Sequence, residues 1–368
     1  MKMRAAVVRE IDQLTIEEVL LDPPQPYELL VRIRAAGVCH SDLHTYRGEL
    51  RAVPPLVLGH EGAGVVEAVG ADVTKFKPGD RVMVNWVPSC NSCPTCLRGQ
   101  PNLCERLPGT TFQALLPDGT TRLKTLDGLT LKHYLSSATM AEYAVIDQAG
   151  AILIADDVPF DVAAVTGCAV MTGIGAVINT AGVEPGSSAA VFGCGGVGLS
   201  AIMGCKLAGC YPIIAVDVME SKLVFARQMG ATHTVNARET DAIDALKKLT
   251  RLGPDYVFDS VGSSTTIGQV LKAVRPGGAA TVMGMHAIKI DVPISAGALV
   301  AQNKKLLGSF FGSGRPHTDL PMLVELYRGG RLPLDDLITK RYALDELPQA
   351  FADMEGGNVA RGVIIFGD

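Results

Sequence analysis

The first third of the chain alternates short apolar runs with turn-forming residues. Five valine-rich runs occupy 4–11, 14–21, 28–38, 62–70 and 80–87. Proline, glycine and aspartate separate them, as in DPPQP at 22–26 and KPGD at 77–80. Apolar runs of this length, bounded by such residues, are typical of β-strands. We predict an antiparallel, barrel-like domain, with the glycine-rich stretch 107–129 as a surface loop or hairpin.

The pattern changes near Ser188, where strands begin to alternate with helices. Strands are predicted at 187–194, 212–218, 254–260 and 279–285, and helices at 196–210 and 220–230. This alternation predicts a parallel sheet with helices on both faces. After Gly312 the elements are mixed again, with expected helices at 320–330 and 345–357 and a last strand at 360–367.

A glycine-rich turn joins the first strand of this second part to its helix. Gly193, Gly195 and Gly198 match G-x-G-x-x-G, and Asp217 ends the next strand, 19 residues after Gly198. This context predicts dinucleotide binding, because glycines let the backbone approach a pyrophosphate and the helix N-terminus offers free N–H groups. The carboxylate of Asp217 favours NAD over NADP, since it would repel a 2′-phosphate. A purely structural turn is the alternative.

Composition and charge exclude several classes of function. The 368 residues carry a net charge of -5, and no block of lysine or arginine occurs. Nucleic acid and anionic membranes are therefore not expected as partners. The N-terminus has no apolar signal core, and we expect no membrane-spanning run of about 20 residues. A cytoplasmic location follows as the expectation.

Four of the nine cysteines stand close together. Cys90, Cys93, Cys96 and Cys104 have the spacing C-x2-C-x2-C-x7-C. A reducing compartment disfavours disulfides, so a metal site is the better interpretation. An iron–sulfur cluster is the alternative, although such runs often continue with proline, whereas Glu105 follows here. Four thiolates predict a closed, structural zinc site in a lobe at 88–106.

A second, dispersed set combines Cys39, His60 and Cys168. Two thiolates and one imidazole leave a fourth position open, which is the pattern of a catalytic zinc. The spacing alone is weak, because a cysteine in an apolar run is usually a small core residue and a histidine after glycine is often a turn residue.

These motifs together resemble the zinc-dependent, NAD-dependent medium-chain alcohol dehydrogenases. GVCHSD (37–42), GHEGAGVVEAVG (59–70), the four-cysteine lobe, Gly167–Cys168 and GCGGVG (193–198) occur in that family's order. The resemblance implies an α/β fold in which a Rossmann doubly wound parallel sheet accompanies an N-terminal GroES-like β-barrel. It implies a catalytic domain at 1–170, a Rossmann domain at 171–311, and a segment at 312–368 that returns to the catalytic domain.

The resemblance also assigns roles near the catalytic zinc. It implies that Cys39, His60 and Cys168 bind this metal, with Glu61 behind it. Asp42 then orients His60, since a ligand imidazole donates its second N–H to an acceptor. Ser41 takes the substrate proton, and His44 passes it on. Ser41 and Asp42 as helix-capping residues are the alternative.

Further residues are assigned to cofactor and substrate. The resemblance implies cofactor contacts at His40, Thr172, Gly193, Gly195, Gly196, Val197, Gly198, Asp217, Lys222 and Arg361. It implies a substrate pocket at Tyr46, Trp86 and Tyr134, which Leu50, Leu135 and Met140 join. Lys222 is otherwise a solvated helix residue, and Trp86, the only tryptophan, is otherwise an ordinary core residue.

The implied reaction is the reversible oxidation of a primary alcohol, aromatic or of medium chain length, to an aldehyde with hydride transfer to NAD. Two zinc ions per chain are expected. The first alternative is a thiol-dependent enzyme, because MVNW (83–86) and ATHTVNARE (231–239) also resemble mycothiol-dependent formaldehyde dehydrogenases. Such enzymes also reduce nitrosothiols. A remote alternative is a non-catalytic NAD-binding relative. A homodimer is expected, or else a tetramer.

Overall fold

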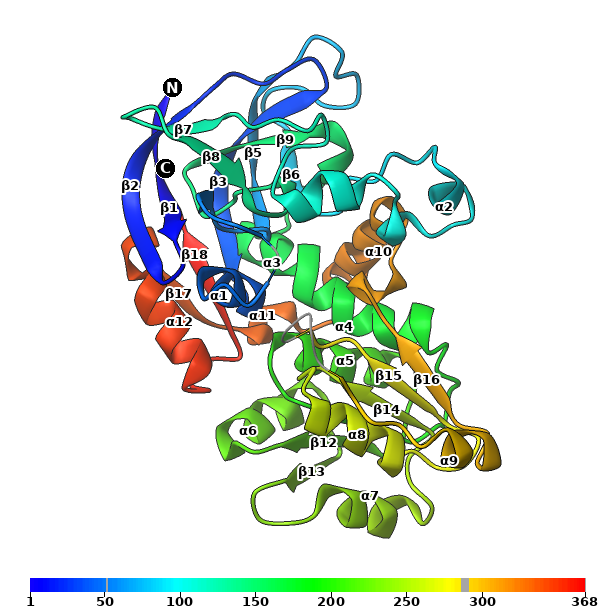
Figure 1. Cartoon of the computed structure of the whole chain (residues 1–368). Helices are drawn as coiled ribbons and strands as arrows, with labels where there is room; N and C mark the ends of the chain where they lie inside the picture. The colour runs from blue at the N-terminus through cyan, green and yellow to red at the C-terminus, as the bar shows by residue number, and fades with distance from the viewer. Residues whose placement is uncertain (51, 286–290, 368) are drawn as a thin grey trace.

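The computed structural model describes residues 1–50, 52–285 and 291–367, and three β-sheets organise them (Figure 1). The first is a closed barrel in the order β1 (Lys2–Glu10), β2 (Gln13–Leu21), β7 (Leu123–Thr125), β8 (Thr130–His133) and β4 (Leu56–Val57). The stretch 107–129 contributes to this barrel rather than lying only on the surface, because β7 pairs with both β2 and β8. Its Leu116 and Leu123 are at most 2% exposed. The prediction that this stretch is only a surface loop was therefore wrong, whereas the predicted hairpin is present as β7 and β8.

The second sheet adjoins the segments of Cys39 and His60, which lie just beyond the ends of two of its strands. Its order is β10 (Ala151–Leu153), β6 (Arg81–Val84), β5 (Gly62–Val69), β3 (Glu28–Val38), β18 (Arg361–Ile365) and β17 (Ile338–Tyr342), and β9 (Tyr143–Asp147) also pairs with β3. The C-terminal β18 runs antiparallel to β3. The first strand of the barrel, β1, and the last strand of this sheet, β18, lie in the same part of the molecule (Figure 1).

The third sheet is parallel and has six strands. Its order is β13 (His233–Asn236), β12 (Ile213–Asp217), β11 (Ala189–Phe192), β14 (Tyr256–Asp259), β15 (Ala279–Val282) and β16 (Lys305–Gly308). This is the 3-2-1-4-5-6 order of a dinucleotide-binding sheet, with the order reversing between β11 and β14. Its helices are α5 (Gly196–Leu207), α6 (Glu220–Met229), α7 (Ala242–Thr250), α8 (Ser264–Ala273) and α9 (Ala296–Ala301). The predicted fold class is confirmed, although α7, α8, α9, β13 and β16 were not predicted.

A continuous helix, Phe160–Thr180, connects the second sheet to the third (Figure 1). It consists of α3 (Phe160–Val165), a π-helical turn (Thr166–Val170), α4 (Met171–Gly175) and a second π-helical turn (Ala176–Thr180). Its 21 residues are long and apolar enough to span a membrane, but 94% of the most apolar window is buried inside the protein. The expectation that no apolar run reaches this length was wrong. The burial instead makes it a core helix.

The remaining α-helices of the described chain are short or lie near the C-terminus, and several single 3-10 turns accompany them. They are α1 (His40–Tyr46), α2 (Pro94–Leu97), α10 (Pro316–Arg328), α11 (Leu334–Leu337) and α12 (Leu347–Glu355). The lobe that carries α2 projects from the body of the molecule beside α10, and α12 lies next to α1 (Figure 1).

Candidate active site

Three separate elements bring the dispersed cysteine and histidine residues together. Cys39 lies between β3 and α1, His60 lies just before β5, and Cys168 lies in the first π-helical turn of the long helix. Their ligand atoms and a carboxylate oxygen of Glu61 all lie within 4.8 Å of one another, and all four residues are buried. The π-turn widens the helix locally, as such turns often do at functional sites.

The donor set fits a zinc ion. Zn–S bonds of about 2.3 Å and Zn–N bonds of about 2.0 Å place tetrahedral ligands roughly 3.5–3.8 Å apart, which the observed cluster allows. A hydrogen bond with the Cys168 thiol and the charge of Arg361 hold the pKa of Cys39 well below its ordinary value, although burial opposes them. A thiolate is the form that binds a metal.

Asp42 holds the imidazole of His60 from behind. Its Oδ1 accepts hydrogen bonds from the backbone N–H of Gly59 at 3.0 Å and from His60 Nδ1 at 3.3 Å. Asp42 is fully buried. Because Nδ1 is engaged, Nε2 is the nitrogen left to face the metal position.

Glu61 lies between His60 and Arg361. Its carboxylate accepts a hydrogen bond from the guanidinium of Arg361, which begins β18, and its Oε1 lies 3.9 Å from His60 Nε2. Burial raises the pKa of Glu61 to about 7, against the lowering effect of the Arg361 charge. A Cβ on Gly37 would lie 2.0 Å from a Glu61 oxygen, so only glycine admits this carboxylate.

The four clustered cysteines form a second donor set. The ligand atoms of Cys90, Cys93, Cys96 and Cys104 lie within 4.8 Å of one another. Backbone N–H groups donate to three of the sulfurs at 3.3–3.5 Å, and one of these bonds, from Cys96 N–H to the Cys93 sulfur, caps α2. Such donors stabilise negative thiolates. The set has four thiol ligands and fits a closed zinc site.

The proposed relay residues lie on α1. Ser41 Oγ is 3.7 Å from Cys39 Sγ, so the hydroxyl borders the metal position, and Tyr134 donates to the Ser41 carbonyl at 3.0 Å. His44 lies nearly one turn further on and pairs through Nδ1 with the half-exposed Glu49. Sequence reasoning missed Glu49, since its separation from His44 matches no motif.

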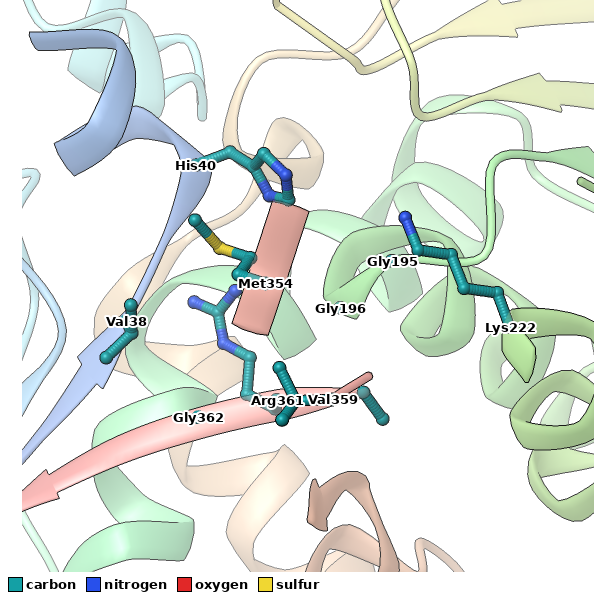
Figure 2. Close-up of a pocket in the computed structure, with 10 residues that line it drawn as sticks. Val38, His40, Gly195, Gly196, Lys222, Met354, Val359, Arg361 and Gly362 are labelled. Atoms are coloured by element: carbon teal, nitrogen blue, oxygen red, sulfur yellow. The ribbon is translucent and has the colours of Figure 1, made fainter. Parts of the chain in front are cut away.

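A pocket lies between α1, β18 and the start of α5 (Figure 2). It is lined by Val38, His40, Gly195, Gly196, Lys222, Met354, Val359, Ala360, Arg361 and Gly362. His40, Met354 and Arg361 enter from one side, and Lys222 lies across from them beside the glycine turn (Figure 2). Two cationic side chains and a helix N-terminus suit a pyrophosphate. The protein atoms packed around His40 lower the pKa of this histidine to about 4, although the residue is still exposed to solvent at the pocket.

The glycine turn has the geometry that a dinucleotide needs. A Cβ on Gly198 would lie 1.8 Å from the Gly193 carbonyl oxygen, so strand and helix approach through glycine alone. A Cβ on Gly195 would meet no atom within 4 Å, and this open space faces the pocket. Asp217 accepts from the backbone N–H of Cys194 at 2.7 Å, which fixes its carboxylate beside the turn. Five of the predicted cofactor residues do not line this pocket: Thr172, Gly193, Val197, Gly198 and Asp217.

Aromatic rings pack against His60 and extend away from it as a cluster. Trp86 and Tyr134 make edge contacts with the His60 ring at centroid distances of 6.2 and 5.5 Å. Phe310 and Phe311 pack edge-on against Trp86 at 5.5 and 5.0 Å, and Phe112 meets Phe310 at 5.9 Å. Sequence reasoning missed these three phenylalanines, because distant segments supply them.

Tyr46 does not belong to this ring cluster. Its ring stacks on Phe351 of α12 at 6.3 Å, and its hydroxyl donates to the Asp12 carbonyl at 3.1 Å. Met140 is fully buried in the core with Leu135 and Tyr134. Tyr46 thus contacts α12 through its ring and the β1–β2 turn through its hydroxyl, and is not part of the predicted substrate pocket wall.

Comparisons with known proteins match this architecture over the whole chain. The family model "Alcohol dehydrogenase GroES-like domain" matches residues 25–156, and "Zinc-binding dehydrogenase" matches residues 196–328. The chain is 40% identical to an alcohol dehydrogenase class-3 of Cereibacter sphaeroides, with all of both chains covered. The chain belongs to the zinc-dependent medium-chain alcohol dehydrogenase family. It is an NAD-dependent zinc enzyme with two candidate zinc sites, as predicted.

Two further relatives bear on the substrate. The chain is 37% identical to an S-(hydroxymethyl)glutathione dehydrogenase of Paracoccus denitrificans, with both chains fully covered. The solved structure of benzyl alcohol dehydrogenase from Acinetobacter calcoaceticus is 33% identical, superimposes with a TM-score of 0.94, and is also covered fully. Zinc-dependent alcohol oxidation is supported by both. The curated relatives favour the thiol-dependent alternative over the free primary alcohol that sequence reasoning preferred.

Proposed function

We propose that this enzyme oxidises the hydroxymethyl group of a thiol–formaldehyde adduct, with transfer of a hydride to NAD. The observation that carries the proposal is the full-length similarity to curated relatives named for S-(hydroxymethyl)glutathione oxidation. The adduct is itself a primary carbinol, so the proposed chemistry at the metal centre is that of a primary alcohol. Oxidation of the adduct gives an S-formyl thioester, and the reverse reaction reduces that thioester with NADH. Reduction of a nitrosothiol is a separate reaction, in which a hydride passes from NADH to the nitrosothiol at the same site.

The chain's own residues bind the reacting group and remove its proton. Cys39, His60 and Cys168 would hold the zinc, which when bound supplies a Lewis acid that lowers the pKa of an alcohol. Ser41 borders this position through Cys39 and accepts the substrate proton. His44 takes the proton onward, and Glu49 receives it at the surface.

The cofactor is held between the two halves of the molecule. His40, Lys222, Arg361 and the glycine turn bind the pyrophosphate, and Asp217 binds the adenosine ribose. NAD accepts the hydride, and the protein supplies its position beside the metal centre.

A free aromatic alcohol is the second candidate substrate. The ring cluster of Trp86, Phe310 and Phe311 beside His60 offers an apolar wall to an aryl group. The similarity to the benzyl alcohol dehydrogenase structure points the same way.

An NADH absorbance assay separates the two candidates. Formaldehyde is offered with glutathione, with mycothiol and with no thiol, and benzyl alcohol is offered alone. The proposal predicts that kcat/KM for formaldehyde rises at least tenfold with one of the thiols and exceeds the value for benzyl alcohol. Thiol-independent turnover of benzyl alcohol at a higher kcat/KM would replace the first candidate by the second.

A further inference from the structure

The segment Ser309–Ser313 forms part of the aromatic wall in an unusual backbone conformation. Phe311, Gly312 and Ser313 have φ values of 52°, 62° and 48°, all in the left-handed region. This region is unfavourable for phenylalanine and serine, so surrounding contacts must hold it. The rings of Phe310 and Phe311 nevertheless reach Trp86 at 5.5 and 5.0 Å. The position of the wall therefore depends on what holds this segment.

One side chain from the four-cysteine lobe holds it. Asn102, two residues before Cys104, is 3% exposed and donates from Nδ2 to the Phe310 carbonyl oxygen at 2.9 Å. The two residues are 208 positions apart in the chain. The lobe thus reaches across to the segment that follows β16.

The other hydrogen bonds to the segment Ser309–Ser313 involve different residues of it. Asn179, at the end of the long helix, donates to the Gly312 carbonyl at 3.2 Å. The Thr180 hydroxyl bonds with those of Ser309 and Ser313 at 2.8 Å each. The Phe310 carbonyl accepts, besides Asn102, the local N–H of Ser313 at 3.0 Å. Among the described residues, Asn102 is therefore the long-range contact that fixes the residue whose ring touches both Trp86 and Phe112.

We propose that Asn102 is a positioning residue for substrate specificity, through which the four-cysteine lobe sets the place of the Phe310 ring against Trp86. The lobe then has a role in the reaction besides stabilising its own fold. Asn102 touches neither the metal position nor the cofactor pocket, so the chemical step is unaffected by it. The inference rests on the proposed function only in placing the carbinol's substituent against this ring wall.

Intrinsic fluorescence gives a readout that needs no turnover, because Trp86 is the only tryptophan. Asn102→Ala is compared with wild type as the full-length, zinc-loaded enzyme. We expect a red-shifted Trp86 emission and at least a twofold higher acrylamide quenching constant, because the Phe310 ring no longer covers the indole. The matched control is Gln113→Ala, since this exposed amide donates only to the Pro108 carbonyl of its own loop, at 3.1 Å, and should leave both values unchanged.

The kinetic readout is a double-mutant cycle on the better carbinol substrate, benzyl alcohol or the S-hydroxymethyl adduct. Asn102→Ala should raise KM about fivefold or more with kcat within a factor of two. In the Phe310→Ala background, Asn102→Ala should raise KM no further.

Unchanged fluorescence and KM in a variant that keeps two zinc ions would overturn the inference, as would fully additive effects of the two substitutions on KM. If Asn102→Ala loses zinc, Asn102→Ser, which keeps a small polar side chain in the lobe, is judged by the same criteria. A wild-type enzyme that turns over neither carbinol would contradict the proposed function, and this outcome is distinct from the Asn102 result.

Discussion

At the scale of single residues, the metal centre is held in place by polar contacts from outside the ligand set. Asp42 fixes His60, and Arg361 pairs with Glu61. Glu61 sits where Gly37 leaves room for it. Each of these groups is buried, so each needs its partner, because an unpaired buried charge is costly. The arrangement presents the thiolates and one imidazole nitrogen toward a single point.

Ser41 gives the sharpest prediction at this scale. Ser41→Ala should lower kcat by about 100-fold or more, because the hydroxyl beside Cys39 no longer accepts the substrate proton. Ser41→Thr should retain most activity, since the hydroxyl survives. Steady-state kinetics of both variants test this, with zinc content measured to show that the metal site is intact. Equal losses in the two variants would contradict a proton-accepting role.

The sequence could single out Cys39, His60 and Cys168, whose ligand atoms the structure brings together, because their residue types are chemically restricted. Cysteine, histidine and aspartate at such spacings have few structural uses together. Phe310 and Glu49 escaped prediction for a physical reason. A phenylalanine is usually a core residue, and only the fold shows that its ring lies against Trp86. Glu49 acquires meaning only through its pairing with His44.

At the scale of elements, polar or metal-binding groups stabilise two segments that have little regular secondary structure. In the lobe around α2, four thiol ligands take the place of a hydrophobic core, and Leu97 there is 73% exposed. The hairpin β7–β8 is held by Arg122, which pairs with Glu28 at 2.7 Å and is 6% exposed. Sequence periodicity predicted neither the barrel role of the hairpin nor its burial, because β7 spans only three residues.

Cys93→Ser tests the lobe. The variant should lose one zinc per chain and lower Tm by roughly 5 °C or more, because metal binding contributes to folding free energy. Zinc analysis and thermal unfolding by circular dichroism measure both. A Tm equal to that of wild type with one zinc missing would show that the site does not stabilise the protein.

His133 tests the hairpin through pH. Burial, together with the charge of Arg122, lowers the pKa of His133 to about 3. The Nε2 atom of His133 accepts a hydrogen bond from the backbone N–H of Arg122 at 3.0 Å. The unfolded state binds this proton below about pH 6.5, whereas the folded state does not, so stability falls as pH falls from about 6.5 toward 3. At pH 5 the loss relative to pH 7.5 is about 2 kcal/mol.

Urea unfolding at the two pH values measures this loss in wild type and in His133→Gln. The variant should lose about 2 kcal/mol less than wild type between pH 7.5 and 5, because glutamine does not titrate. An identical pH dependence in the two proteins would show that His133 is protonated in the folded state.

At the scale of the whole molecule, the cofactor pocket lies where the parts of the chain meet. His40 comes from the region before the long helix, Lys222 from α6, and Arg361 from the C-terminal strand (Figure 2). The fold class could be predicted because the strand–helix alternation and the glycine turn are local signals. The long helix 160–180 was missed as a helix because glycine and threonine interrupt its apolar run, and its burial depends on packing against both halves.

We expect cofactor choice to depend on Asp217, which lies beside the glycine turn. Its carboxylate, fixed by the Cys194 N–H, should exclude a 2′-phosphate. We expect kcat/KM for NAD to exceed that for NADP by roughly 100-fold, equal to about 2.7 kcal/mol. Asp217→Asn should narrow this ratio by at least about tenfold, since the negative charge is lost. Comparable values for the two cofactors in wild type would contradict the assignment.

The proposed catalytic site is tested most directly in Cys39→Ala, by measuring zinc content per chain and NADH formation in the same preparation. We propose that the reaction takes place at Cys39, His60 and Cys168 and that the four-cysteine site has no part in the chemistry. We therefore expect a folded protein that keeps one zinc per chain, held by the lobe, and forms no NADH above background with any carbinol. Turnover near that of wild type in a protein with a single zinc would contradict it.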